Sequence, residues 1–212
     1  MKNLLSSQYI IVRLLMLVLF ISITSCAAIP STDSGFLEDY SQLQEDKNGD
    51  KSLKWWEKND FDWGKYKSLM LDPVVVLYHP QTKDKKISAY KENELATYFH
   101  STVSTELEGK YQVVSTPGPE VLRIRAAITE ITPSSPAINY PAMLLVFFPV
   151  DMGGATIEVE FLDSETNEVL ATMVDKKRGS PFTPRAFSRL GHTRAAFDGW
   201  AKELRKALDT HP

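Results

Sequence analysis

The feature that most constrains this chain is an apolar run near its amino terminus, residues 14–23. Lys2 and Arg13 precede the run and no acidic residue occurs among the first 25 positions, which is the layout of a secretory signal peptide. As a helix, the run would be about 15 Å long, half of the roughly 30 Å hydrocarbon core of a bilayer. A longer helix would carry Arg13 into lipid, which disfavours the alternative of a permanent transmembrane segment. We therefore predict that residues 1–25 are a signal peptide.

The next segment, Ile23-Thr24-Ser25-Cys26, contains the single cysteine of the chain and resembles the lipobox of bacterial lipoproteins. In that family the thiol receives a diacylglyceryl group, the peptide is cut before the cysteine, and the new amino group is acylated. The resemblance implies lipid attachment at Cys26, with palmitate as an acyl group and the membrane as a partner. Two or three acyl chains hold a protein at a bilayer essentially permanently. The alternative is an ordinary signal peptide that leaves a free thiol or no cysteine.

The residue after the cysteine, Ala27, bears on localisation. In lipoproteins of enteric bacteria, Asp at that position favours retention in the inner membrane. Ala27 therefore implies sorting to the outer membrane of a Gram-negative bacterium, with the domain on the periplasmic face. Residues 27–35 are small, polar and contain Pro and Gly, so we interpret residues 26–35 as the lipidated cysteine and a tether.

Composition indicates that the remainder, residues 36–212, folds as a single domain, and the order of its predicted strands and helices makes this domain α+β. The chain is 43% hydrophobic and carries a net charge of -3, from 24 basic and 27 acidic residues. Without residues 1–25 there are 22 basic and 27 acidic residues, and this acidic balance argues against a nucleic-acid partner. A lone cysteine also excludes an intrachain disulfide framework.

Hydrophobic periodicity predicts a mixed or antiparallel sheet of about five strands, with two main helices packed on one face. The first helix begins after Ser88 and ends before Gly109, with apolar residues recurring every four positions. The second begins at Thr183-Pro184 and continues through Leu208. The predicted strands are residues 74–78, 111–115, 121–131, 155–161 and 169–175, the last two forming a hairpin through the turn at residues 163–167.

Two of these strands also predict a polar sheet face. Arg123 and Arg125 alternate with apolar residues in one strand, and Glu158 and Glu160 do so in another. If the strands pair, these charges lie opposite one another, at roughly 0.2 to 1 kcal/mol per pair. We interpret this face as solvated, and the alternative is an open docking surface.

Several segments resemble a family of proteobacterial lipoproteins catalogued as domain-of-unknown-function family 3313. The resemblance covers nearly all of the chain after the signal peptide and implies no activity, because none is established for the family. Beyond Cys26, the matching segments are Gly35-Phe36-Leu37, Asp39-Tyr40-Ser41 and Leu43, Tyr66, Met70 to Val74, Val113-Val114, Pro117 to Thr129, Gly153-Gly154, Glu160, Asp163 to Leu170, and residues 196–208.

A polar loop at residues 46–57 partly matches a calcium-binding EF-hand. Asp46, Asn48, Asp50 and Glu57 place oxygen ligands at loop positions one, three, five and twelve. Lys51 occupies position six, where the loop requires Gly for a sharp turn and where a positive charge opposes a cation. We therefore favour a polar turn leading into a strand, with calcium binding as the alternative.

The sequence contains no recognisable catalytic signature, so we predict a protein that is not an enzyme and has no catalytic residues, metal site or cofactor. Glycine-rich phosphate loops and nucleophile elbows are missing from the sequence. Acid pairs at Glu158/Glu160 and Asp60/Asp62 are more often solvated faces than acid–base catalysts. The four histidines are dispersed, at His79, His100, His192 and His211.

Two apolar features are ambiguous. Residues 142–150 form an apolar run between Pro141 and Pro149, too short to cross a membrane as a helix. We favour a buried strand or core-closing segment, and the alternative is an exposed loop that contacts lipid or a partner. A cluster of aromatic residues is expected to cover the core rather than to stack on cell-wall glycans: Trp55, Trp56, Trp63 and Tyr66.

Together these observations favour an outer-membrane-anchored lipoprotein that faces the periplasm and acts as a non-catalytic interaction or envelope assembly module, with an envelope protein as partner. The alternative is a ligand-binding or enzymatic lipoprotein that acts on lipid or cell-wall material. An exposed apolar surface would favour the first, and a closed cavity with converging ionisable groups would favour the second.

Overall fold

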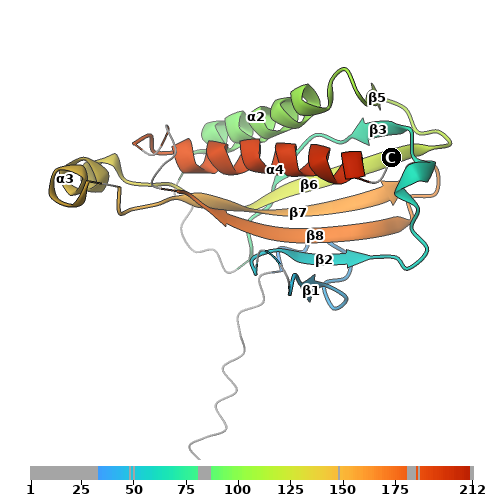
Figure 1. The fold of residues 1–212 in the computed structure, drawn as a ribbon, viewed down its shortest axis with the longest axis horizontal. Helices are drawn as coiled ribbons and strands as arrows, with labels where there is room; N and C mark the ends of the chain where they lie inside the picture. Colours follow the sequence, from blue (N-terminus) through green and yellow to red (C-terminus); the bar gives the residue numbers. More distant parts are fainter. Residues whose placement is uncertain are drawn as a thin grey trace, which may run out of the picture. The chain divides into compact units, whose positions relative to one another are not determined.

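The structure, a computed structural model, describes residues 33–47, 49, 51–80, 87–147, 149–180, 185 and 187–210. The chain divides into two units, residues 1–32 and residues 33–212, and all described residues lie in the second unit. This unit is a mixed sheet of eight strands with two long helices on one face (Figure 1).

The sheet has the order β1-β2-β8-β7-β6-β3-β5, with β4 also paired to β6. The neighbours β1, β2, β8, β7 and β6 pair antiparallel to one another. On the other side of β6, strands β3 and β4 pair parallel to β6, and β5 pairs parallel to β3. The longest strands lie at the centre, as expected for the strands that bury both faces. The strands are β1 (Gln44–Glu45), β2 (Lys54–Glu57), β3 (Ser68–Leu71), β4 (Val75–Val76), β5 (Gln112–Val114), β6 (Val121–Thr132), β7 (Gly154–Asp163) and β8 (Val169–Arg178).

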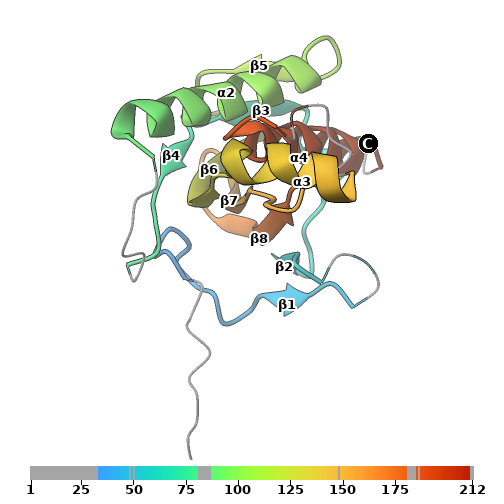
Figure 2. The same cartoon turned by 90° about the vertical axis from the view of Figure 1, so that its left-hand side faces the viewer.

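Helices α2 (Ala89–Leu107) and α4 (Gly191–Thr210) cover one face of the sheet, hereafter the helical face (Figure 2). Phe99 of α2 stacks on Phe197 of α4 with ring centroids 4.7 Å apart. Trp200 of α4 donates its indole N–H to Asp175 of β8 at 2.6 Å, which satisfies both buried groups. The core therefore closes between these two helices and the central strands.

Several predicted elements are confirmed. Helix α2 begins after Ser88, and Gly109 follows its end with a φ of 79°, a left-handed conformation that glycine adopts without strain. The β7–β8 hairpin turns through Asn167, with a φ of 58°. At the start of that turn, the Asp163 carboxylate accepts bonds from the backbone N–H groups of Glu165 and Thr166 at 3.1 Å.

The predicted strand count is wrong, because the sheet has eight strands where the sequence indicated about five. Beyond the five predicted strands the sheet contains β1, β2 and β3, which are two to four residues long and follow no alternation of apolar and polar residues. Of these three, the sequence indicated only β2, as a strand that follows the polar loop. Their pairing with longer neighbours, such as β2 with β8, places them in the sheet. The predicted helix start at Thr183-Pro184 lies outside the described residues, and α4 begins at Gly191.

A third helix, α3 (Pro136–Val146), was also missed. It lies beyond the end of the sheet at which β6 ends and β7 begins (Figure 1). One further short element, η1 (Trp63–Lys65), is a 3-10 turn in which the Asp62 carboxylate accepts the Gly64 N–H at 3.0 Å.

Candidate functional site

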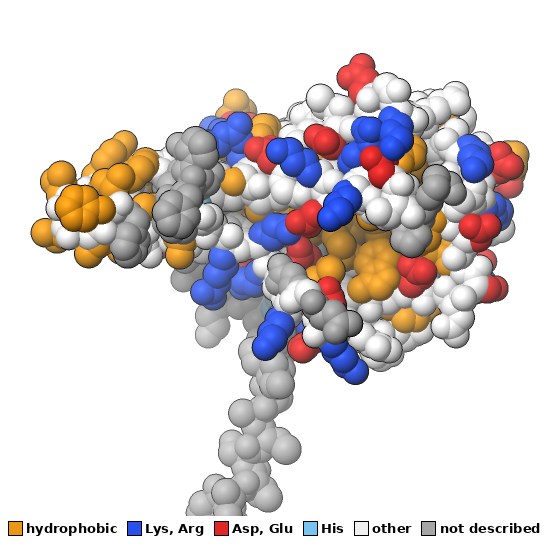
Figure 3. Space-filling view, in the orientation of Figure 1, with side chains coloured by type: hydrophobic (Ala, Val, Ile, Leu, Met, Phe, Trp, Pro, Cys, Tyr) orange, Lys and Arg blue, Asp and Glu red, His pale blue; other side chains and the backbone are white. Residues whose placement is uncertain are grey.

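Helix α3 and the segment that returns from it to β7, residues 147–153, expose an unusual amount of apolar side chain. The largest exposed fractions are 82% at Leu144, 79% at Leu145 and 83% at Phe147. Figure 3 shows this surface in orange at the end of the molecule where Figure 1 labels α3. Six further large hydrophobic side chains are exposed in the same segment: Ile138, Tyr140, Met143, Val146, Val150 and Met152.

This finding corrects the favoured interpretation of residues 142–150. The run is neither a strand nor a core-closing segment, because its first five residues belong to an exposed helix and Phe147 ends that helix in a left-handed conformation, with a φ of 63°. The alternative, an exposed apolar segment, describes its geometry. Ser135 at the N-cap and Pro136 in the first turn, a usual combination at helix starts, were the signal that could have located this helix.

A buried polar network holds the return segment against α3. The Asn139 side chain is 0% exposed, and its carbonyl oxygen accepts the backbone N–H groups of Val150 at 3.1 Å and Asp151 at 2.8 Å. Its amide nitrogen donates to the Asp151 carbonyl at 2.9 Å, and the Asp151 carboxylate accepts the Ser135 N–H at 2.7 Å. The exposed apolar surface is therefore held by four hydrogen bonds rather than left as an irregular loop.

Basic residues lie beside the base of α3. A hollow of about 280 Å³ is lined by Met152 of the return segment together with Lys176 and Arg178 at the end of β8. Lys176 is paired with Glu130 at 2.7 Å, whereas Arg178 forms no ion pair within the described part of the chain. A Cβ on Gly153 would lie 2.2 Å from the Thr132 carbonyl oxygen, so the backbone approach beside this hollow requires glycine.

The sheet face opposite the helices is covered at Glu158 and Glu160, which corrects the prediction that these two side chains are solvated. These side chains are 0% and 1% exposed, because residues 34–40, hereafter the strap, cross this face. The Glu158 carboxylate accepts the Ser34 hydroxyl at 2.9 Å and the Tyr40 hydroxyl at 2.5 Å. Figure 2 shows the blue segment that precedes β1 passing below the sheet, on the side away from α2 and α4.

The predicted pairing of charges on this face is confirmed in part. Arg125 lies opposite Glu160 and donates to its carboxylate at 2.9 Å. Burial raises the pKa of Glu160, and the Arg125 guanidinium opposes that rise. Arg123 instead lies opposite Leu162 and forms two hydrogen bonds with Asp72, at 3.0 and 2.7 Å.

The Tyr40 hydroxyl organises the strap. It accepts the backbone N–H groups of Gly35 at 3.0 Å, Phe36 at 3.1 Å and Leu37 at 3.2 Å. It donates its own proton to Glu158, and burial raises the pKa of this tyrosine. The matching segments Gly35-Phe36-Leu37 and Asp39-Tyr40-Ser41 therefore form a structural cover for a buried carboxylate.

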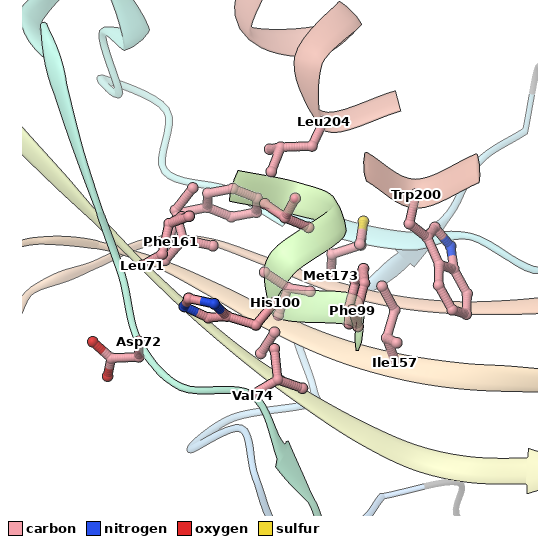
Figure 4. Close-up of a pocket in the computed structure, with 14 residues that line it drawn as sticks. Leu71, Asp72, Val74, Phe99, His100, Ile157, Phe161, Met173, Trp200 and Leu204 are labelled. Atoms are coloured by element: carbon pink, nitrogen blue, oxygen red, sulfur yellow. The ribbon is translucent and has the colours of Figure 1, made fainter. Parts of the chain in front are cut away.

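A small apolar cavity lies between α2, α4 and the helical face (Figure 4). Its volume is about 50 Å³, enough for one or two water molecules at about 30 Å³ each. Asp72 and His100 lie at its border, and Figure 4 shows the Asp72 carboxylate directed away from the apolar side chains. The cavity is far smaller than the roughly 300 to 1,000 Å³ of typical ligand sites.

The predicted polar loop of residues 46–57 comprises the connection that follows β1 and the whole of β2. The Asp46 N–H donates to the Leu53 carbonyl at 3.0 Å, and Glu57 lies within β2, where its carboxylate accepts the Trp63 indole N–H at 3.2 Å. Asn48 and Asp50 lie outside the described residues. The described part of the loop therefore leads into a strand, as the favoured interpretation predicted.

The aromatic cluster covers the core as expected, except at one residue. Trp55 and Trp63 stack with ring centroids 6.2 Å apart, and the ring centroids of Trp63 and Phe161 are 5.4 Å apart. Tyr66 packs against the same core. Trp56 lies opposite Thr172 in the β2–β8 pairing and therefore on the sheet face away from the helices.

The other histidine and acidic residues that the sequence analysis considered form no common site among the described residues. Among the described residues, no group of three or more His, Cys, Asp or Glu side chains is arranged to hold a metal. Asp60 pairs with Lys58 at 3.5 Å, and Asp62 caps η1. His192 is buried at the start of α4, which lowers its pKa, and the nearby Asp151 carboxylate partly opposes that change. His211 and Cys26 lie outside the described residues.

Within the described ranges, no helix combines the length and the apolar character that crossing a membrane requires. The fold and its surfaces define an α+β domain with a covered polar sheet face and a projecting apolar helix. The chain belongs to the family described as "Protein of unknown function (DUF3313)", whose model matches residues 32–204.

A curated relative is the "Uncharacterized lipoprotein YdcL" of Escherichia coli (strain K12), which is 25% identical over 191 residues covering 80% of this chain and 85% of the relative. A solved structure of the PelC dodecamer from Paraburkholderia phytofirmans is 8% identical, with a TM-score of 0.39 over 69% of this chain and 93% of that one. Protein XCC0632 from Xanthomonas campestris is 9% identical, with a TM-score of 0.40 over 74% and 94% of the two chains.

Proposed function

We propose that this protein is a lipid-anchored, non-catalytic interaction or assembly module of the bacterial envelope, and that α3 with its return segment is its contact surface. The observation that carries the proposal is the exposure of nine large hydrophobic side chains between Ile138 and Met152. An exposed apolar patch of this kind on a folded domain usually marks an interaction site. The 50 Å³ cavity at the helical face is smaller than typical ligand sites, and the larger hollows, of about 280 and 430 Å³, lie at the base of α3 beside the proposed contact surface.

The anchor in this proposal is the lipid on Cys26, with the domain on the periplasmic face of the outer membrane. Membership of the family and a relative that is a lipoprotein support this part. Mass spectrometry of the mature protein tests it, because the amino-terminal peptide should carry diacylglyceryl and acyl mass on Cys26. A mature protein whose amino-terminal peptide carries no diacylglyceryl or acyl mass would contradict the anchor.

The contact surface is tested by photo-crosslinking in intact cells. A photoreactive amino acid at Leu145, which is 79% exposed on α3, should form reproducible adducts with an envelope component. The matched control is Tyr90, which is 75% exposed at the start of α2 and should give background labelling only. Labelling at Leu145 no stronger than at Tyr90 would contradict the proposal.

A further inference from the structure

We propose that α3 and its return segment insert into the surface of an anionic phospholipid bilayer, as a second, non-covalent membrane contact beside the lipid anchor. This inference rests on the proposed function, because it assigns an occupant to the same surface. Three features of the folded domain and the length of the tether favour a bilayer over a protein partner.

The first feature is the chemistry of the projecting segment. Residues 133–153 contain one charged side chain, Asp151, and its carboxylate is held by the Ser135 N–H. The exposed residues Leu144, Leu145 and Phe147 follow one another at the end of α3, so the apolar surface is a tip rather than a flat stripe. A tip without charge matches the acyl boundary of a bilayer, where interfacial helices bury their apolar side chains about 5 to 10 Å deep.

The second feature is the charge of the segment that lies against the base of α3. Residues 176–197 contain no acidic residue and six basic ones, although the chain as a whole carries a net charge of -3. The six are Lys176, Lys177, Arg178, Arg185, Arg189 and Arg194. Four of them pair with acidic side chains outside the segment: Lys176 with Glu130, Lys177 with Glu203, Arg185 with Asp198 and Arg194 with Glu94. Arg178 forms no ion pair among the described residues, so the attraction to anionic headgroups rests above all on Arg178.

The third feature is that contacts place this basic segment beside α3. The Ser134 N–H donates to the Arg189 carbonyl at 2.9 Å, and the Gly179 N–H donates to the Gly153 carbonyl at 2.7 Å. Tyr140 of α3 stacks on Phe187 with centroids 5.4 Å apart. Figure 3 shows Lys and Arg side chains in blue between the apolar tip and the body of the domain. Tyr140 and Phe187 thus lie between apolar and charged surface, where aromatic residues are favoured at membrane interfaces.

The fourth feature is the reach of the tether. Six residues separate Cys26 from Asp33, and the seven Cα–Cα steps between these two residues span at most about 25 Å. The strap begins at Ser34, which bonds to Glu158, and Glu158 lies four positions along β7 from Gly154, or about 13 Å. The tether therefore joins the domain about 13 Å along β7 from Gly154, which lines the hollow beside the base of α3.

The test uses the full lipidated protein reconstituted in vesicles of phosphatidylcholine with or without phosphatidylglycerol. Because Cys26 is the single cysteine and its thiol carries the lipid, a Leu144→Cys variant offers one free thiol for an environment-sensitive fluorophore. With phosphatidylglycerol, the emission should shift to the blue and be quenched by nitroxide-labelled acyl chains. A Tyr90→Cys variant labelled in the same way should stay in water.

A charge reversal gives the second measurement. Arg178→Glu should lower the ratio of inserted to exposed label by about fivefold or more in vesicles with phosphatidylglycerol, the effect expected for a basic side chain at an anionic surface. Lys202→Glu, at an exposed position in α4, is the matched control and should change the ratio little. Equal effects of the two variants would overturn the assignment of Arg178 to the membrane contact.

The outcomes separate this inference from the proposed function. A label at residue 144 that stays in water in both kinds of vesicle overturns the membrane contact, and a protein adduct at Leu145 in cells would then still support an interaction module. If the Cys26→Ser protein carrying Leu144→Cys inserts when added to the vesicles, the membrane contact holds even where the anchor fails. In that protein the cysteine at position 144 is the single thiol, so the fluorophore reports on this position alone.

Discussion

The covered sheet face buries acidic side chains, whereas the surface of α3 exposes apolar ones, and both depart from the usual distribution of side chains. Under the strap, the carboxylates of Glu158 and Glu160 are almost completely buried, at 0% and 1% exposure. On α3, Leu144 and Leu145 are about as exposed as side chains become in a folded domain, at 82% and 79%. Buried carboxylates and exposed leucines both cost free energy unless something compensates them.

The difference between the two regions lies in where that compensation is found. Glu158 has its partners within the domain, because Ser34 and Tyr40 donate to its carboxylate. The leucines of α3 have no cover from the described residues, although the Asn139 network holds the helix in place. The buried carboxylates under the strap are therefore compensated within the domain, whereas the apolar surface of α3 is covered by no described residue.

The largest expected effect separates membrane contact from stability at α3. The double variant Leu144→Asp with Leu145→Asp should weaken bilayer insertion by about a hundredfold or more, because two side chains each lose about 1.5 to 3 kcal/mol of apolar burial. Its free energy of unfolding should change by less than about 0.5 kcal/mol, since both residues are exposed. Urea denaturation and vesicle partitioning measure the two quantities. A large loss of stability would mean that α3 belongs to the core. Tyr90→Asp, at an exposed position in α2, is the control for an added charge.

The opposite pattern is expected under the strap. Tyr40→Phe removes the donor to Glu158 and the acceptor for the Gly35, Phe36 and Leu37 N–H groups. Because a buried charged acceptor loses a partner, unfolding should become easier by about 1.5 to 3 kcal/mol, with no change in bilayer insertion. Ser41→Ala, at the exposed residue that follows the strap, should cost much less in the same denaturation assay. Similar values for the two variants would show that the Tyr40–Glu158 bond does not stabilise this face.

A smaller and more local effect is expected at the junction of α3 with its return segment. Asn139→Ala removes three hydrogen bonds to residues 150 and 151, so the free energy of opening this segment should fall by about 1 to 3 kcal/mol. Hydrogen exchange should accelerate there and not in the strap. Ile138→Ala, at a 52% exposed neighbour, is the control. Unchanged exchange in the Asn139 variant would contradict the role of this side chain in holding α3.

The smallest expected effect is a dependence of stability on pH. Burial holds the pKa of His192 below its usual value of about 6.5, so the folded state binds fewer protons than the unfolded state. Its contribution is fully present above that value and is lost as pH falls toward the folded pKa. The raised pKa of Glu160 acts in the opposite direction at lower pH. Melting temperatures of wild type and His192→Asn between about pH 7.5 and 5.5 should converge as pH falls, and parallel curves would contradict this contribution.

The strongly periodic segments could be predicted from the sequence, because local pattern determined them. Helix α2, strand β6 and the β7–β8 hairpin each carry a regular apolar repeat or a turn residue such as Asn167. The short strands β1, β2 and β3 carry none, since pairing with longer strands forms them.

The site was less predictable for a related reason. Alternation at Glu158 and Glu160 indicated a polar face, and nothing in their own strand shows that residues more than a hundred positions earlier cover it. An apolar run such as residues 142–150 usually marks a core, and its exposure is a consequence of tertiary structure. The basic composition of residues 176–197 gains meaning only once contacts place that segment beside α3.

Hydrogen–deuterium exchange of the lipidated protein with and without a phosphatidylglycerol-containing bilayer tests the central claim most directly, because it reports both regions in one experiment. The account predicts that the bilayer protects residues 136–153 at α3 and its return segment, and leaves the strap at residues 34–40 unchanged. Equal exchange of residues 136–153 in detergent and in the bilayer, or protection confined to the strap, would contradict it.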